Sequence, residues 1–128
     1  MRQLIVILVI CDNMREILTW LYGKSGRNRH IREMAKQAVA ILNKEQSLDH
    51  QELAERLGIG FDKYQKPKRT FYFVINPLKK VQLIKDKRVY KDGKKKSYKT
   101  MYYIDASAFN GYMKRIIDET FEKIKEEN

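Results

Sequence analysis

The chain has 128 residues, of which 43% are hydrophobic and 34% are charged, and its formal net charge is +11 at pH 7. A chain of this length forms one domain with a real core, and it contains no low-complexity segment or internal repeat. Its single cysteine excludes an intrachain disulfide framework, which fits a cytoplasmic protein. The abundance of Lys, Glu, Ile and Tyr is typical of thermophilic proteins, in which charge networks become relatively more favourable on heating.

The positive charge is concentrated in one part of the chain. The segment 63–99 contains 14 Lys and Arg residues and only two acids, Asp86 and Asp92, so the other residues together are close to neutral. A local basic cluster of this kind is the electrostatic footprint of a polyanionic partner. A lysine-rich surface that is merely solvated is the alternative.

Residues 1–27 predict an N-terminal apolar strand followed by a short helix. The apolar run 4–11 is too short to span a membrane and lacks a small-residue cleavage site, so we expect no membrane partner. The run should form a buried or partner-covered strand, unless translation starts at Met14. Asn13 and Glu16 have the spacing of a capping box, which predicts a helix from Met14 to about Tyr22.

Two further helices are expected in residues 28–58. The first, over about 28–44, carries apolar residues at i, i+3 and i+4 spacing that should face the core. The second begins at a capping box formed by Asp49 and Glu52, and Gly58 supplies the positive φ that ends it before a tight turn. Three basic residues near the start of the first helix either reach a nucleic-acid backbone or are solvated: Arg27, Arg29 and Arg32.

The segment Thr70 to Ile75 has the β-branched and aromatic residues of a strand, but its apolar spacing is helical and continues through Leu78 and Val81. We therefore predict a helix over about 67–82. The outward positions of this helix hold Arg69, Tyr72, Phe73, Asn76, Lys79 and Lys80.

A β-hairpin is predicted next, because two β-prone runs, 88–91 and 98–104, flank Asp92-Gly93 and a lysine-rich loop. Asp105 then caps a C-terminal amphipathic helix over 105–128. Its apolar stripe must be covered either by the core of the same chain or by a second copy, and we favour a homodimer. The expected interface residues are Tyr112, Ile116, Ile117, Phe121 and Ile124.

Residues 28–127 resemble the winged helix-turn-helix DNA-binding domains, especially those of archaeal and bacterial transcription regulators, and the winged helix-turn-helix unit itself is expected over 28–104. The similarity lies in Glu52 to Ile59, in Pro77 to Ile84 at the end of the recognition helix, and in Tyr102 to Ile104 of the returning wing strand. Two features depart from the family pattern: Gln82 stands where many members have Gly, and residues 60–66 lengthen the turn. The resemblance implies an α+β, mainly helical fold with a β-hairpin wing and flanking N- and C-terminal helices.

The resemblance also implies a sequence-specific double-stranded DNA-binding protein of the nucleoid, a transcriptional regulator of archaeal type. Recognition helices read bases mainly through their first half, so the expected base contacts are Arg69, Tyr72, Phe73 and Asn76. A core position is the alternative for Phe73. The expected backbone contacts are Lys66, Lys68, Lys79 and Lys80 near the helix and Lys94, Lys95, Lys96 and Lys99 on the wing.

No constellation for catalysis is found, so we expect a protein that is not an enzyme and that uses no metal or cofactor. Cys11 lies in an apolar run without an adjacent base, and His30 and His50 are not at metal-ligand spacing. Two alternatives from other classes stay open. An RNA-binding winged domain would stack unpaired bases on Tyr72 and Phe73, whereas a protein-interaction module would use the C-terminal apolar stripe.

Overall fold

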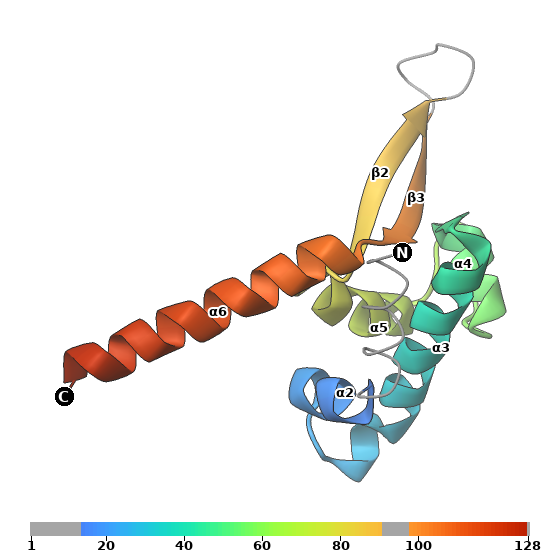
Figure 1. Ribbon diagram of the computed structural model, residues 1–128. Helices are drawn as coiled ribbons and strands as arrows, with labels where there is room; N and C mark the ends of the chain where they lie inside the picture. The colour runs from blue at the N-terminus through green and yellow to red at the C-terminus, as the bar shows by residue number, and fades with distance from the viewer. Residues whose placement is uncertain (1–13, 91–97, 128) are drawn as a thin grey trace.

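The computed structural model describes residues 14–90 and 98–127, and it shows an α+β, mainly helical fold with a winged-helix-like layout (Figure 1). The predicted fold class is therefore confirmed. The apolar run 4–11 and the three lysines Lys94, Lys95 and Lys96 lie outside the described residues. The elements are α2 (Met14–Tyr22), the 3-10 turn η1 (Gly26–Asn28), α3 (Arg29–Glu45), β1 (Ser47–Asp49), α4 (His50–Arg56), α5 (Arg69–Lys80), β2 (Ile84–Tyr90), β3 (Tyr98–Ile104) and α6 (Ala106–Glu127).

The sheet is antiparallel and has the strand order β1-β3-β2. Strand β1 was not predicted, because three residues are too few for a periodic pattern and their strand hydrogen bonds come from pairing with β3, as in Ser47↔Tyr103. Strand β2 begins at Ile84, opposite Ile104, and not at residue 88 as predicted. The charged sequence after Ile84 has weak strand propensity, which the long ladder with β3 overrides.

Helix α4 begins and ends as its sequence predicts. The Asp49 carboxylate accepts the backbone N–H of Glu52 at 2.8 Å, and Gly58 adopts a φ of +73° after the last turn. The predicted tight turn into the next helix is wrong, because residues 57–68 form a long connection of turns between the two helices. This connection is ordered by an isolated bridge between Phe61 and Pro67 and by the carboxylate of Asp62, which accepts two backbone N–H groups.

Helix α5 confirms the helical prediction for residues with strand-like composition. Its apolar face, Phe71, Val74, Ile75 and Leu78, is at most 1% exposed and packs in the core with α3 and the sheet. The helix ends at Lys80, and two residues later Gln82 adopts a φ of +66° at the position where many winged helix-turn-helix domains have Gly. The end of the helix nevertheless forms its closing hydrogen bonds, from Gln82 N to Lys79 O and from Leu83 N to Leu78 O.

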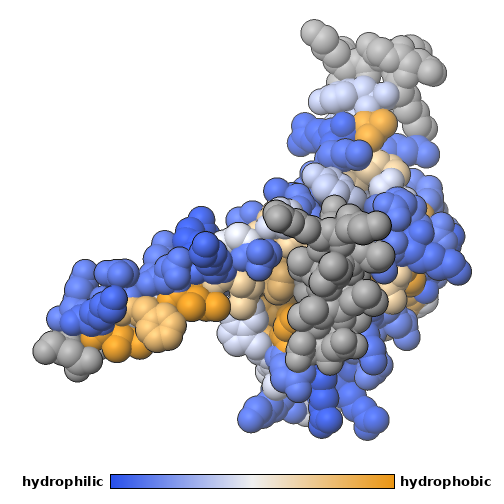
Figure 2. Space-filling model, viewed as in Figure 1, coloured by the Kyte–Doolittle hydropathy of each residue, from blue (hydrophilic) through white to orange (hydrophobic). Residues whose placement is uncertain are grey.

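Helix α6 starts on the core and then leaves it (Figure 1). The Asp105 carboxylate caps its first turn by accepting the N–H of Ala108 at 2.9 Å, and Phe109 is buried. Further along, Ile117, Phe121 and Ile124 are 49%, 59% and 49% exposed, and Figure 2 shows this apolar stripe along the helix. The core formed by residues 14–90 and 98–127 therefore does not cover the distal part of the stripe. Among the residues described, no helix combines the length and the apolar character that crossing a membrane requires.

Candidate nucleic-acid interface

The outer face of α5 carries the residues that the sequence assigns to base recognition. One side of α5 packs in the core through Phe71, Val74 and Ile75. Because of the helical period, the opposite side is exposed to solvent. The exposed residues are Arg69, Tyr72, Phe73, Asn76 and Lys80. Phe73 is 58% exposed, so its alternative placement in the core is wrong. The helix thus presents cationic, amide and aromatic groups on one solvent-facing surface.

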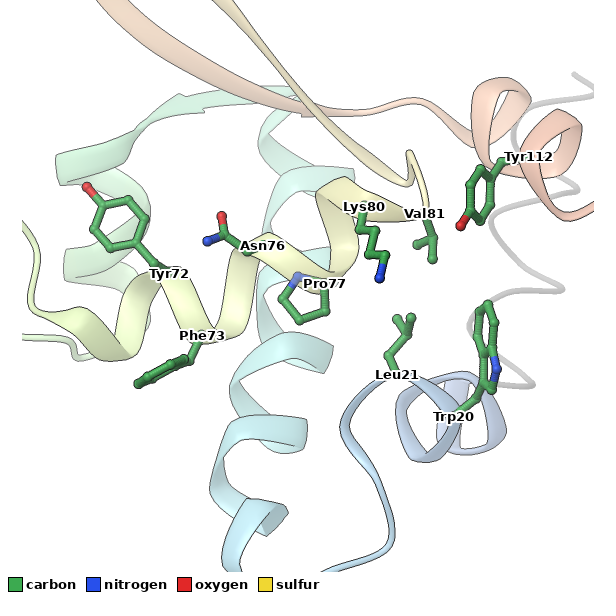
Figure 3. Close-up of a pocket in the computed structure, with 9 residues that line it drawn as sticks. All are labelled: Trp20, Leu21, Tyr72, Phe73, Asn76, Pro77, Lys80, Val81 and Tyr112. Atoms are coloured by element: carbon green, nitrogen blue, oxygen red, sulfur yellow. The ribbon is translucent and has the colours of Figure 1, made fainter. Parts of the chain in front are cut away.

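Part of this face borders a groove that the sequence did not predict. The groove has a volume of about 550 Å³ and is shared by α5, α2 and the first turns of α6 (Figure 3). Its far wall is built by Trp20 and Tyr112, whose aromatic rings lie opposite the end of α5 that holds Lys80. The residues that line it are Trp20, Leu21, Tyr72, Phe73, Asn76, Pro77, Lys80, Val81 and Tyr112.

Two of the lysines assigned to backbone contacts are already paired with acids. Lys79 Nζ lies 3.0 Å from Asp86 Oδ2, and Lys99 Nζ lies 3.8 Å from Asp49 Oδ2. The Lys79–Asp86 pair is exposed on both sides, and such pairs contribute about 0–1 kcal/mol, so a phosphate can replace Asp86 at little cost. The Asp49 side chain is only 8% exposed, so this range for exposed pairs does not apply to its pair with Lys99. Lys66, Lys68 and Lys80 are exposed, whereas the proposed roles of Lys94, Lys95 and Lys96 concern residues outside the described ranges.

The hairpin adds a second group of candidate residues, which the sequence reading missed. Arg88, Tyr90 and Tyr98 lie on one face of the hairpin, because Arg88 pairs with Thr100 and Tyr90 pairs with Tyr98 in the ladder. The guanidinium carbon of Arg88 lies 4.6 Å from the ring centroid of Tyr98, and the Tyr90 and Tyr98 rings meet edge to face at 5.9 Å. We call these three residues the aromatic cluster. The strand register that brings these residues together depends on β2 starting at Ile84.

The same face of the hairpin joins α5 at its base. Tyr102, two pleats from Tyr98, packs edge-on against Phe71 of α5 with ring centroids 5.8 Å apart. Burial raises the pKa of Tyr102 to about 12, with smaller contributions from the charges of Asp86 and Tyr72. The face of the hairpin that carries the aromatic cluster therefore packs, at its base, against the buried side of α5.

The arginines near the start of α3 have a structural role as well as a surface one. Arg32 Nη1 donates to the carbonyls of Gly23 and Ser25 at 2.7 and 2.9 Å, which fastens the turn between α2 and α3. Arg29 lies with Arg32 in a separate basic hollow between these two helices. Within 14–90 and 98–127, no three His, Cys, Asp or Glu side chains are grouped closely enough to hold a metal ion.

No protein-family model matches this chain, and no curated protein matches it at a significant level. The chemistry of the exposed groups must therefore support any function on its own. That chemistry is a helix face with Arg69, Asn76 and Lys80, together with a hairpin that carries exposed cations and aromatic rings.

Proposed function

We propose that this protein binds double-stranded DNA in a sequence-specific manner and acts as a transcriptional regulator of the nucleoid, without catalysis. One observation carries the proposal: α5 buries its whole apolar face yet exposes a row of hydrogen-bonding and cationic side chains beside a projecting basic hairpin. An α-helix fits the major groove of B-DNA, and a basic flank holds the backbone. The concentration of 14 Lys and Arg residues in 63–99 supports a polyanionic partner.

The side chains on α5 match the chemistry of base edges. A guanidinium such as that of Arg69 can donate two hydrogen bonds to guanine, and an amide such as that of Asn76 can pair with adenine. Tyr72 offers a hydroxyl, and Phe73 offers an apolar surface for a thymine methyl group. The residues proposed to hold phosphates are Lys66, Lys68, Lys79, Lys80 and Lys99, and Lys94, Lys95 and Lys96 stay predictions from the sequence.

The test is fluorescence anisotropy with duplexes selected from a random pool, compared with unselected duplexes over a series of salt concentrations. If about five phosphates are engaged, log K should fall against log salt with a slope of roughly −4 to −5. Asn76→Ala should weaken only the selected duplex, by about 1–3 kcal/mol, whereas Lys80→Ala should weaken all duplexes and reduce the slope by about one.

Two exposed residues away from this surface provide matched controls. Asn110→Ala on α6 and Lys36→Ala on α3 make the same chemical changes and should leave both the affinity and the salt slope unchanged. A slope near zero, or equal binding to selected duplex and to heparin, would contradict sequence-specific DNA binding.

We also propose that two copies pair through α6 in antiparallel orientation. The first half of α6 carries Lys114 and Arg115 and no acid, whereas residues 118–127 carry five acids and two lysines. Antiparallel pairing places the basic half of each helix beside the acidic half of its partner and covers the exposed stripe. A two-fold dimer also suits half-sites about 34 Å apart on DNA. The proposed contacts are Tyr112, Ile116, Ile117, Phe121 and Ile124.

Sedimentation equilibrium tests the dimer. The chain should sediment at twice its mass of 15.3 kDa, and Ile117→Asp should give a folded monomer with weakened binding to a two-half-site duplex. Asn110→Asp adds the same charge to the exposed polar side of the helix and should stay dimeric. A wild-type monomer at tens of micromolar would rule out the pairing.

RNA binding is the second candidate, and the exposed rings of Tyr72, Phe73, Tyr90 and Tyr98 favour it. Proteins that recognise RNA commonly stack aromatic side chains on unpaired bases. Competition of a hairpin RNA against the selected DNA duplex distinguishes the two. Stronger competition by the RNA than by unlabelled duplex would favour the RNA-binding function.

A further inference from the structure

One face of the hairpin is buried at its base and exposed at its outer end. At the base, Ile84, Tyr102 and Ile104 are buried in the core. Four ladder positions beyond Tyr102 on the same face, Tyr90 and Tyr98 are 48% and 46% exposed, and no core element among the described residues covers them. The rings of the aromatic cluster therefore stand in solvent at the outer end of a supported strand pair.

The aromatic cluster is held in a defined geometry before any ligand arrives. Tyr98 contacts the guanidinium of Arg88 at 4.6 Å and the ring of Tyr90 at 5.9 Å, with 61° between the ring planes. The ladder pair Tyr90↔Tyr98 fixes both backbones. Aromatic side chains have few rotatable bonds, so such a surface loses little conformational entropy when it binds a flat ligand.

The chemistry of this cluster favours an unpaired nucleobase. Two π systems and a planar cation suit a flat, polarisable ring that is linked to a phosphate. Within a duplex, the faces of the bases are covered by their neighbours and only the edges are accessible in the grooves. A base can stack on Tyr90 or Tyr98 only where it has left the helix, as in an overhang, a bulge or a single strand.

We infer that the aromatic cluster binds one unpaired nucleotide, of DNA or RNA, by stacking next to the nucleic acid held by α5. This inference rests on the proposed nucleic-acid function and names a substrate feature that α5 alone would not select. Arg88 attracts the phosphate of the unpaired nucleotide, while the rings of Tyr90 and Tyr98 supply the stacking surface.

The test compares a blunt duplex with the same duplex carrying a short single-stranded overhang that contains 2-aminopurine. Overhangs of DNA and of RNA are separate arms, which identify the source of the nucleotide. The full chain should bind the overhang substrate about 5- to 150-fold more tightly, the range expected for stacking of one base. The fluorescence of 2-aminopurine should fall on binding, because stacking quenches it.

Variants separate stacking from other contacts. Tyr98→Ala should abolish both the gain in affinity over the blunt duplex and the quenching, and Tyr98→Phe should retain both. Tyr64→Ala is the matched control, because Tyr64 is also an exposed tyrosine beside a cation, with Lys63 Nζ 5.1 Å from its ring, but lies in the 57–68 connection. Val89→Ala is a second control, because it removes an exposed side chain from β2, the strand that holds Tyr90, on the opposite face of the hairpin.

Three results would overturn the inference: equal affinity for blunt and overhang substrates, a gain that persists in both Tyr90→Ala and Tyr98→Ala, or a gain lost in Tyr98→Phe. The last result would indicate a hydrogen bond from the tyrosine hydroxyl instead of stacking. Circular dichroism confirms that each variant is folded. If the blunt duplex is not bound while a single strand is bound and quenched in a Tyr98-dependent manner, the duplex-binding function fails and this inference stands.

Discussion

Helices α5 and α6 are both amphipathic, yet the molecule uses their apolar faces in different ways. Helix α5 buries Phe71, Val74, Ile75 and Leu78 almost completely, whereas α6 buries Phe109 and then exposes Phe121 and its neighbours. An apolar stripe of helical period predicts a face that must be covered. It does not say whether the same chain or a second molecule covers it.

The difference arises from where each helix is anchored. Helix α5 lies between α3 and the sheet, and the hydroxyl of Tyr22 donates to the carbonyl of Val74, which ties it to α2. Among the described residues, α6 is anchored at its start, by the Asp105 cap and by the core contacts of Phe109, Tyr112 and Met113, and it then extends away from the body (Figure 1). The surface left for a ligand is therefore the polar face on α5 but the apolar face on α6.

The largest expected effect comes from shortening a buried side chain on α5. Leu78→Ala leaves a cavity in the core and should lower the free energy of unfolding by about 2–5 kcal/mol. Ile124→Ala on α6 also removes apolar carbon atoms, but from an exposed position, so it should change the free energy of unfolding of the monomer by less than about 0.5 kcal/mol. Urea denaturation at concentrations that keep the chain monomeric measures both. Equal losses would show that the distal part of α6 packs on its own chain.

Tyr22→Phe tests the tie between α2 and α5. Loss of the hydrogen bond to Val74 should cost about 0.5–1.5 kcal/mol at neutral pH. Burial raises the pKa of Tyr22 far above its ordinary value of 10.0, so the folded state retains the phenol proton. This contribution is fully present below pH 10 and is lost as the pH rises further.

Denaturation curves at pH 8 and above pH 10 therefore distinguish the two proteins. The wild type should lose more stability than Tyr22→Phe over this interval, and Tyr102, with its pKa raised to about 12, should account for part of the decline that remains. Identical pH dependence in wild type and variant would contradict a buried, protonated Tyr22.

The end of α5 offers a smaller, stabilising change. Gln82 has a φ of +66°, which costs a side-chain-bearing residue free energy that glycine does not incur, so Gln82→Gly should add about 0.5–1 kcal/mol to stability. Gly58 occupies the equivalent position after α4, and a Cβ there would meet no atom within 4 Å. Gly58→Ala should therefore destabilise through the backbone alone, by about 1 kcal/mol. Thermal unfolding of both variants checks the opposite signs.

The smallest effect on stability is expected at the outer face of α5. Asp86→Asn removes the exposed partner of Lys79 and should change the free energy of unfolding by at most about 0.5 kcal/mol. Because the change frees a lysine and removes a negative charge, it should tighten the proposed duplex binding severalfold at low salt. The control is Asp118→Asn on α6, which makes the same change of charge away from α5. Weaker duplex binding by Asp86→Asn would contradict the assignment of Lys79 to phosphate contact.

Local chemistry in the sequence predicted most of the helices. The caps at Asp49 and Asp105 and the helix end at Gly58 depend on hydrogen bonds and φ preferences that span only a few residues. For α5, the helical spacing of the apolar residues was a better predictor of structure than the strand-like composition of residues 70–75. The roles of these helices in DNA binding and in pairing stay predictions.

Only the tertiary structure decided how separate segments meet. Strand β1 and the start of β2 at Ile84 exist because β3 pairs with both, and the Tyr90↔Tyr98 contact follows from that register. The groove beside α5 needs Trp20 and Tyr112, which are 92 residues apart in the chain. Such contacts depend on long-range packing, and no periodic pattern within one segment encodes which distant segment will cover it.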